Sequence, residues 1–102
     1  MRERDYRESR ICRILGNPTA YQILVLLLSG PRRPAEIIPA VGRSPVTVSL
    51  TLRILRNADL VRYEHKGRDT HYRLKYPAEV RAAVSALRRL VVRTSRRIRK
   101  DR

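Results

Sequence analysis

The chain is poor in the residues from which metal sites, disulfides and aromatic cores are built. Its 102 residues include one cysteine, two histidines, no tryptophan and no phenylalanine. A single cysteine excludes an internal disulfide and is typical of a reducing compartment. One cysteine and two histidines cannot complete a tetrahedral zinc site without carboxylates or a second subunit. We therefore expect no metal site and no other cofactor.

Acidic residues and long apolar runs are also scarce. Nine acids stand against 24 lysines and arginines, which gives a formal charge of +15. The longest apolar run, 23–28, is far shorter than the roughly 20 residues of a membrane-spanning helix. The charged N-terminus has no apolar stretch behind it, so no signal peptide is expected. We expect no membrane contact, a cytoplasmic (nucleoid-associated) location and a polyanionic partner, because arginine-rich surfaces suit phosphates.

The composition is that of one small folded domain. Hydrophobic residues make up 42% of the chain, which is enough for a core. There is no internal repeat and no Gly/Ser-rich linker, so residues 1–102 are expected to form a single domain. A chain of this length buries only roughly 60–65% of its unfolded surface, so a dimer partner would stabilise it.

The first third of the chain has the periodicity of two helices. Apolar residues among arginines and acids predict a helix at 5–15 that ends at Gly16. Asn17 and Pro18 are a capping residue and a first-turn proline, and they predict a mostly buried helix that continues to residue 29.

The next two helices are close together. Pro34 opens a short helix that Gly42 ends, and Ser44 caps a helix predicted at 45–57. Two helices joined by a glycine-containing turn of about three residues are typical of a helix-turn-helix. In the first of them we expect inward side chains at Ala35, Ile37, Ile38 and Val41. In the second we expect inward side chains at Val48, Leu52 and Leu55, and outward ones at Val46, Thr47, Ser49, Leu50 and Arg53.

After residue 60 the apolar period changes to two, which predicts a β-hairpin with its tip at Lys66-Gly67-Arg68-Asp69. In this register Tyr63 faces Tyr72 and Val61 faces Leu74 on the core side. His65 is expected on the core side and His71 on the outer face, as packing or solvent residues rather than metal ligands.

A last helix is predicted at 77–92, and its apolar stripe is more than a small domain needs for its own core. The stripe favours a dimer interface, expected at Val84, Leu87, Leu90 and Val91. Cys12 fits the first helix, at 5–15, as a small apolar residue, and an intersubunit disulfide is the alternative. The basic tail, 93–102, is either a solvated disordered end or a phosphate-binding arm.

The complete string is helix, helix, short helix, helix, hairpin, helix. This order predicts a mainly α fold with a β-hairpin wing (α+β). It is a winged helix-turn-helix with a helical segment added at each end.

Three segments also resemble a known family. LGNPTAYQIL at 15–24, VGRSPVTVSLTLRILRNADLV at 41–61 and KGRDTHYRL at 66–74 resemble, in order and spacing, the ArsR (ArsR/SmtB) family of repressors. The resemblance covers roughly residues 10–92. It implies a homodimer joined by its first and last helices, which adds Ile11 and Ile14 to the expected dimer interface. It also implies a recognition helix in the major groove of double-stranded DNA and a wing on the backbone or minor groove. The DNA contacts that it implies are Ser44, Pro45, Val46, Thr47, Ser49, Leu50, Arg53, Lys66, Gly67 and Arg68.

The sequence departs from the family pattern at two kinds of site. The family often has Arg-His where this chain has Leu50-Thr51, so base reading would fall to Arg53 or to apolar contacts with thymine methyls. Metal-sensing members carry Cys-x-Cys where this chain has Arg33 and Ala35, and others use acids and histidines on the last helix, where it has only Glu79. The resemblance is therefore to a member without the recognised metal site.

Three functions remain in competition. The favoured one is a homodimeric transcriptional regulator, a repressor by family analogy, that binds a pseudo-palindromic operator. A sequence-non-specific DNA-coating or architectural protein is the alternative, supported by the high charge. A winged helix used for protein contact is the third. No nucleophile–base–acid set, Gly-rich phosphate loop or paired carboxylates are present, so an enzyme is not expected.

Overall fold

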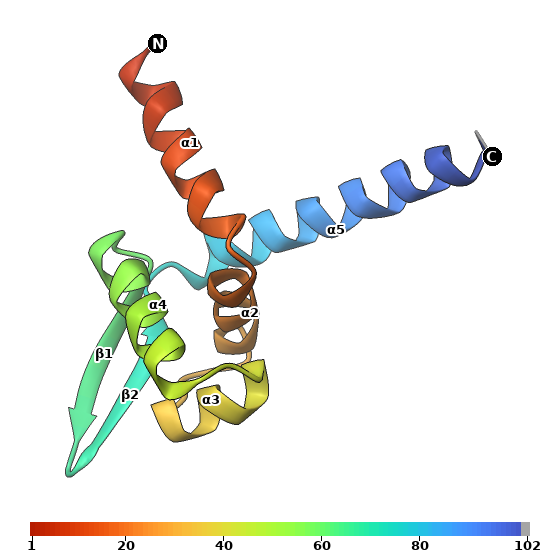
Figure 1. Cartoon of the computed structure of the whole chain (residues 1–102). Coiled ribbons are helices and arrows are strands. Elements are labelled where there is room, and N and C mark those ends of the chain that lie inside the picture. Colours follow the sequence, from red (N-terminus) through yellow and green to blue (C-terminus); the bar gives the residue numbers. More distant parts are fainter. Residues whose placement is uncertain (101–102) are drawn as a thin grey trace.

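The computed structural model describes the backbone of residues 1–100 and the side chains of residues 1–95. Its elements follow the predicted order: α1 (Glu3–Leu15), α2 (Pro18–Leu27), α3 (Pro34–Val41), α4 (Pro45–Asn57), β1 (Val61–Lys66), β2 (Asp69–Leu74) and α5 (Pro77–Lys100). This confirms the predicted winged helix-turn-helix. The body consists of α2, α3 and α4, and the hairpin, α1 and α5 project from it in different directions (Figure 1).

Helix α2 lies at the centre of the core. The Asn17 side chain accepts hydrogen bonds from the backbone N–H groups of Thr19 and Ala20, at 3.0 and 3.1 Å, as expected of a helix cap. Ile23 and Leu24 are completely buried. The helix ends at Leu27, two residues earlier than predicted.

Helix α3 has the predicted bounds. Gly42 ends it in the left-handed region at φ +65°, which glycine adopts without the steric cost of a Cβ. Ile37 and Val41 are buried, as predicted, and Ile38 packs against the core. Ala35 is exposed, so its predicted inward position is wrong. It lies two residues before Ile37, which is roughly 200° around a helix and on the opposite side.

Helix α4 begins and ends at the predicted residues. The hydroxyl oxygen of Ser44 accepts a hydrogen bond from the backbone N–H of Thr47 at 3.1 Å. Val48, Leu52 and Leu55 are buried, as predicted. Thr51 is also buried, which the apolar pattern did not indicate. Its hydroxyl donates to the carbonyl of Thr47 at 2.7 Å, which satisfies the buried polar group.

The hairpin has the predicted register, with Tyr63 opposite Tyr72 and Val61 opposite Leu74. Only this last pair is buried. His65 is exposed, contrary to the core position expected for it, because the core ends near the base of the hairpin. A two-way backbone pairing between Arg32 and Tyr72, at 2.8 and 3.0 Å, ties the segment before α3 to β2.

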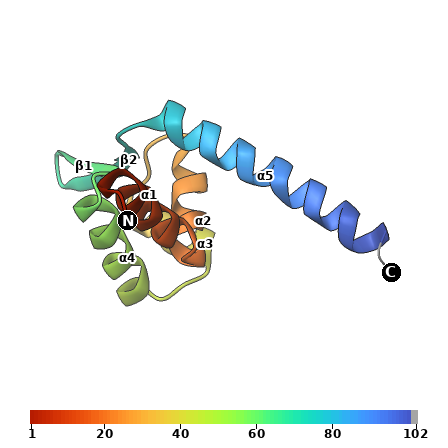
Figure 2. The ribbon, with the colours of Figure 1, turned by 90° about the horizontal axis from the view of Figure 1, so that it is seen from above.

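Helix α5 begins in the core and continues well beyond the predicted end at residue 92. Val80 and Val84 pack in the core, and the backbone remains helical to Lys100. The predicted basic tail is thus helical as far as this residue, and residues 101–102 lie outside the described part of the chain. Seen from above, α5 extends away from the body (Figure 2). No helix within residues 1–100 is long and apolar enough to cross a membrane.

Candidate nucleic-acid interface

One face of α4 is turned to solvent and carries a mixture of apolar, hydroxyl and cationic side chains. Val46 and Leu50 are 68% and 51% exposed, although both are apolar. Ser49 and Arg53 are exposed on the same helix. The opposite face of α4 is buried in the core, so the backbone of this helix is held firmly. The result is a rigid helix that presents these four side chains outward.

The start of α4 is exposed and electropositive. Ser44, Pro45 and Thr47 are exposed there, and the Ser44 hydroxyl donates to the Thr47 hydroxyl at 2.9 Å. Arg43 precedes the cap and is also exposed. Because the first N–H groups of a helix carry a partial positive charge, this end is suited to a phosphate.

The tip of the hairpin carries cations. Lys66, Gly67 and Arg68 are exposed, and Gly67 adopts φ +63° to close the turn. Neither Lys66 nor Arg68 has an ion-pair partner within the part of the chain whose side chains are described. Both charges are therefore available to a polyanion.

Elsewhere on the hairpin, one arginine is neutralised. Arg73 donates to the Glu64 carboxylate at 2.8 Å across the two strands. This hydrogen bond is the main reason that the pKa of Glu64 lies below its usual value. Among the residues whose side chains are described, the hairpin cations without an ion pair are Lys66 and Arg68 at its tip and Arg62 near its base.

An arginine and a tyrosine connect the end of α4 to the hairpin. The Arg56 guanidinium lies over the Tyr63 ring, 4.2 Å from its centroid. Tyr63 in turn contacts Tyr72 at a centroid distance of 5.9 Å and His65 at 5.4 Å. The sequence identified Tyr63 and Tyr72 as a cross-strand pair, but nothing in its pattern indicated Arg56. This stack fixes the hairpin against α4.

A second contact holds the base of the hairpin. Asp59, in the turn after α4, adopts φ +63°. Its carboxylate accepts a hydrogen bond from the Lys75 ammonium at 2.7 Å. This contact lowers the pKa of Asp59 and raises the pKa of Lys75.

The terminal helices carry the apolar side chains for which we expected a dimer interface. Leu90 and Val91 are 57% and 61% exposed, Leu87 and Ile11 are less exposed, and Ile14 packs partly against the core. Val84 is different, because it is 2% exposed and belongs to the core of the subunit. The available apolar face of α5 thus begins one turn later than predicted, and it includes Val92.

The potential metal ligands are scattered. No group of three or more His, Cys, Asp or Glu residues within the described part of the chain could hold a metal ion. Cys12 is exposed on α1. His65 shares a hydrogen bond with the Thr70 hydroxyl at 3.0 Å, and His71 is half-buried on β2. Arg33, at a family metal position, instead pairs with Glu36 at 3.3 Å.

A helix-turn-helix followed by a two-stranded wing defines the class of winged helix-turn-helix proteins, and comparison with known proteins narrows it. The family model described as "Bacterial regulatory protein, arsR family" matches residues 17–63. The HTH-type transcriptional regulator CmtR of Mycobacterium tuberculosis is 36% identical over 73 residues, which are 69% of this chain and 62% of CmtR. This chain therefore spans less than two thirds of the length of the curated relatives that it matches.

Solved structures agree with this comparison. The NMR structure of the cadmium metal-sensor CmtR is 34% identical, covers 76% of this chain and 80% of its own, and has a TM-score of 0.64. A homodimeric winged helix-turn-helix domain, Mb0332 of Mycobacterium bovis, is 29% identical, with coverages of 90% and 87% and a TM-score of 0.67. Rv0081 of M. tuberculosis has a TM-score of 0.85 at 23% identity and coverages of 96% and 99%, which shows the fold alone.

The chain belongs to the ArsR family of bacterial regulatory proteins. This confirms the resemblance that the three sequence segments indicated. The matching model and CmtR are regulators, in agreement with the prediction that the chain is not an enzyme.

Proposed function

We propose that this protein is a homodimeric transcriptional regulator that binds double-stranded DNA and represses transcription from a pseudo-palindromic operator. The observation that carries the proposal is the exposed face of α4 beside a hairpin whose tip holds free cations. Helix α4 and the hairpin lie side by side on one side of the body (Figure 1). A helix whose exposed face is held from behind by the core, beside a charged wing tip, is what a reader of the major groove requires.

The proposed contacts divide into two kinds. Arg53 is the side chain of α4 that can bind a base edge bidentately, and Val46 and Leu50 are placed for thymine methyls. The hydroxyls of Thr47 and Ser49, and the cations Lys66 and Arg68 with Gly67 between them, suit phosphate oxygens. Ser44, whose hydroxyl donates to Thr47, holds the start of the helix at this contact. Pro45 sets the first turn of the helix and brings its backbone close to the DNA.

The homodimer is supported by the exposed apolar side chains of α1 and α5. Ile11, Leu87, Leu90 and Val91 would be covered by a second copy, with Ile14 at the edge of the contact. The solved relative Mb0332 is described as homodimeric. A two-fold dimer would present two α4 helices to half-sites about 34 Å apart, one turn of the DNA.

No metal signal is included in the proposal. CmtR is described as a cadmium sensor, and residues 1–95 of this chain bring together no group of three or more His, Cys, Asp or Glu residues that could hold a metal ion. The repressor role rests on the family resemblance.

The direct test is fluorescence anisotropy with two labelled duplexes, the DNA upstream of the protein's own gene and a scrambled sequence, over a series of salt concentrations. A preference of about a thousandfold or more at physiological salt would establish a sequence-specific regulator. Equal affinities with a steep salt dependence would instead establish a DNA-coating protein. Absence of binding to either duplex would contradict both and favour protein contact.

A further inference from the structure

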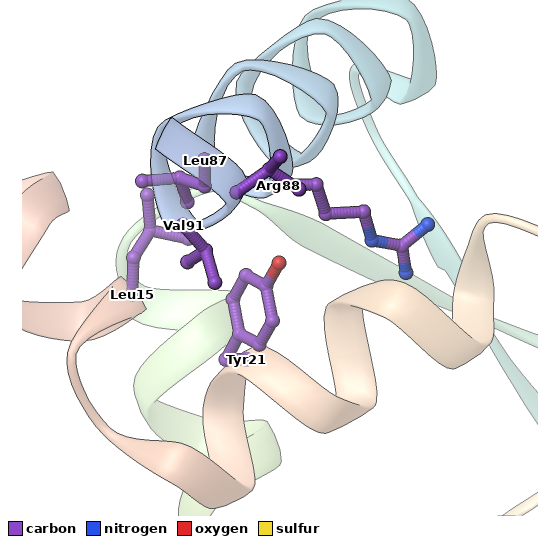
Figure 3. Close-up of a pocket in the computed structure, with 6 residues that line it drawn as sticks. Leu15, Tyr21, Leu87, Arg88 and Val91 are labelled. Carbon is purple, nitrogen blue, oxygen red and sulfur yellow. The ribbon is translucent and has the colours of Figure 1, made fainter. Parts of the chain in front are cut away.

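A surface groove lies where α2, α3 and α5 meet, away from the face proposed to bind DNA. Its volume is about 320 Å³, and it is lined by Tyr21, Gln22, Val25, Leu26, Ala40, Val41 and Arg88. Tyr21 and Arg88 also border a more apolar pocket of about 530 Å³ toward α1. Figure 3 shows that pocket, with Leu15, Leu87 and Val91 on one side and the Arg88 side chain reaching over α2.

The chemistry of the smaller groove is specific. Its walls are mainly apolar, and its polar groups are the Tyr21 phenol, the Gln22 amide and the Arg88 guanidinium. No acidic residue lines it. Arg88 has neither an ion pair nor a hydrogen bond within the described part of the chain. An apolar groove with a few polar groups and one uncompensated cation is suited to a small organic anion.

We propose that this groove binds a small organic carboxylate with an apolar body, and that the bound carboxylate changes the affinity of the protein for DNA. The carboxylate would accept two hydrogen bonds from the planar guanidinium of Arg88. Its apolar body would pack on Val25, Leu26 and Ala40. The volume is near the lower end of the range for small-molecule sites, which favours a ligand about the size of a single ring.

The position of the groove provides the connection to DNA binding, and this part rests on the proposed function. Arg88 lies on α5 between Leu87 and Val91, which belong to the proposed dimer face. Val41, on the opposite wall, directly precedes the Gly42 turn that leads into α4. A ligand that touches both walls would favour one position of α5 relative to the helix-turn-helix. If the ligand binds more tightly to one arrangement of α5 and the helix-turn-helix than to another, and DNA also distinguishes the two arrangements, ligand binding will change the affinity for DNA.

The larger pocket toward α1 is not proposed as the site. Its walls include Leu87 and Val91, which the second copy would cover in the proposed dimer. The smaller groove has no residue of the expected dimer interface among its walls. A ligand there would lie beside the expected dimer interface, with Tyr21 and Arg88 bordering both pockets.

Binding can be tested without DNA by titrating the full-length, ¹⁵N-labelled protein with benzoate and, separately, with its neutral analogue benzamide. Benzoate is expected to shift the backbone amide signals of Gln22, Leu26 and Ala40. Benzamide should bind at least about tenfold more weakly, because it lacks the charge-assisted contact with Arg88. Arg88→Gln should remove this preference. Arg89→Gln is the matched control, since Arg89 is the next residue but hydrogen-bonds to Ser85 at 2.8 Å.

The outcomes separate the groove from the proposed function. Absence of shifts with benzoate, equal binding of benzamide, or an unchanged preference in Arg88→Gln would overturn the site, whatever the DNA experiments show. Shifts confined to Leu15, Leu87 and Val91 would assign the ligand to the larger pocket and also overturn it. Anisotropy with the upstream duplex at saturating benzoate then tests the coupling, for which a change in DNA affinity of about fivefold or more is expected. Benzoate binding with unchanged DNA affinity would overturn the role as an effector site.

Discussion

Replacing Arg56 should loosen the hairpin from α4 while leaving the domain folded. Its guanidinium is 4.2 Å from the centroid of the Tyr63 ring, a distance at which a cation is attracted to the electron-rich face of the ring. Tyr63 is 40% exposed, so solvent screens the contact. We therefore expect a coupling free energy of about 0.5–1 kcal/mol, the range for exposed cation–π pairs.

A double-mutant cycle measures this coupling directly. The free energy of unfolding would be determined by urea denaturation for wild type, Arg56→Met, Tyr63→Leu and the double variant, at one fixed protein concentration. Methionine keeps the apolar stem of Arg56 and removes its charge. A parallel cycle with Arg62→Met is the matched control, because Arg62 lies on the outer face of the same strand and should show no coupling to Tyr63.

The same variants predict a change in DNA binding. A hairpin released from α4 should hold Lys66 and Arg68 less firmly against the phosphates, so Arg56→Met should reduce the dependence of affinity on salt. Tyr63→Phe should behave like wild type, because the ring face is retained. Additive effects of Arg56→Met and Tyr63→Leu on unfolding, within about 0.3 kcal/mol, would refute the reasoning.

The remaining predictions concern the other parts of the proposed interface. Arg53→Ala should cost about 1–3 kcal/mol of binding and relax the preference at one base position; in anisotropy, an equal loss on all duplexes would make it a phosphate contact instead. Arg68→Ala should weaken binding to every duplex and reduce the salt slope by about one unit, and an unchanged slope would contradict wing contact. Val91→Asp should convert the proposed dimer into a monomer in sedimentation equilibrium, since it would bury a charge at the proposed interface; a dimer that persists in the variant would place the interface elsewhere. Because the Lys75 contact lowers the pKa of Asp59, its stabilisation is complete above pH 3.8, the ordinary pKa, and is lost as the pH falls through the lower folded-state value. Asp59→Asn should therefore be less stable than wild type near neutral pH, and the difference in unfolding free energy, measured by urea denaturation, should shrink as the pH falls below about 4. A difference that stays constant with pH would rule the contact out.

Local signals in the sequence were sufficient where one or two residues determine the backbone. The Asn17-Pro18 and Ser44-Pro45 pairs each start a helix. The Asn or Ser side chain accepts hydrogen bonds from free N–H groups of the first turn, and proline adds no N–H group that would need a partner. The four-residue hairpin tip sets the register, and with it the pairing of Tyr63 and Tyr72. These features need no knowledge of the rest of the molecule.

Features that depend on distant neighbours could not be predicted from the pattern. Val84 is apolar and lies on the same stripe as Leu90, but only the fold reveals that the core reaches the first and not the second. His65 follows the alternation of a core strand, although the core ends before it. The continuation of α5 was missed because arginines were interpreted as a tail, whereas arginine is a good helix former. The Arg56 contact with Tyr63 joins two elements, and no periodicity encodes it.

Helix α5 has the geometry of a lever, because one end is held in the core and the rest projects from the body (Figure 1). Its first two turns are clamped in the core by Val80 and Val84, and the helix continues without interruption to Lys100. At 1.5 Å of rise per residue, a rotation of about 5° at Val84 displaces the far end by roughly 2 Å. A small rotation of α5 in the core would thus become a displacement of several times its local size at the far end of the helix. In a symmetric pair, this displacement occurs once in each subunit.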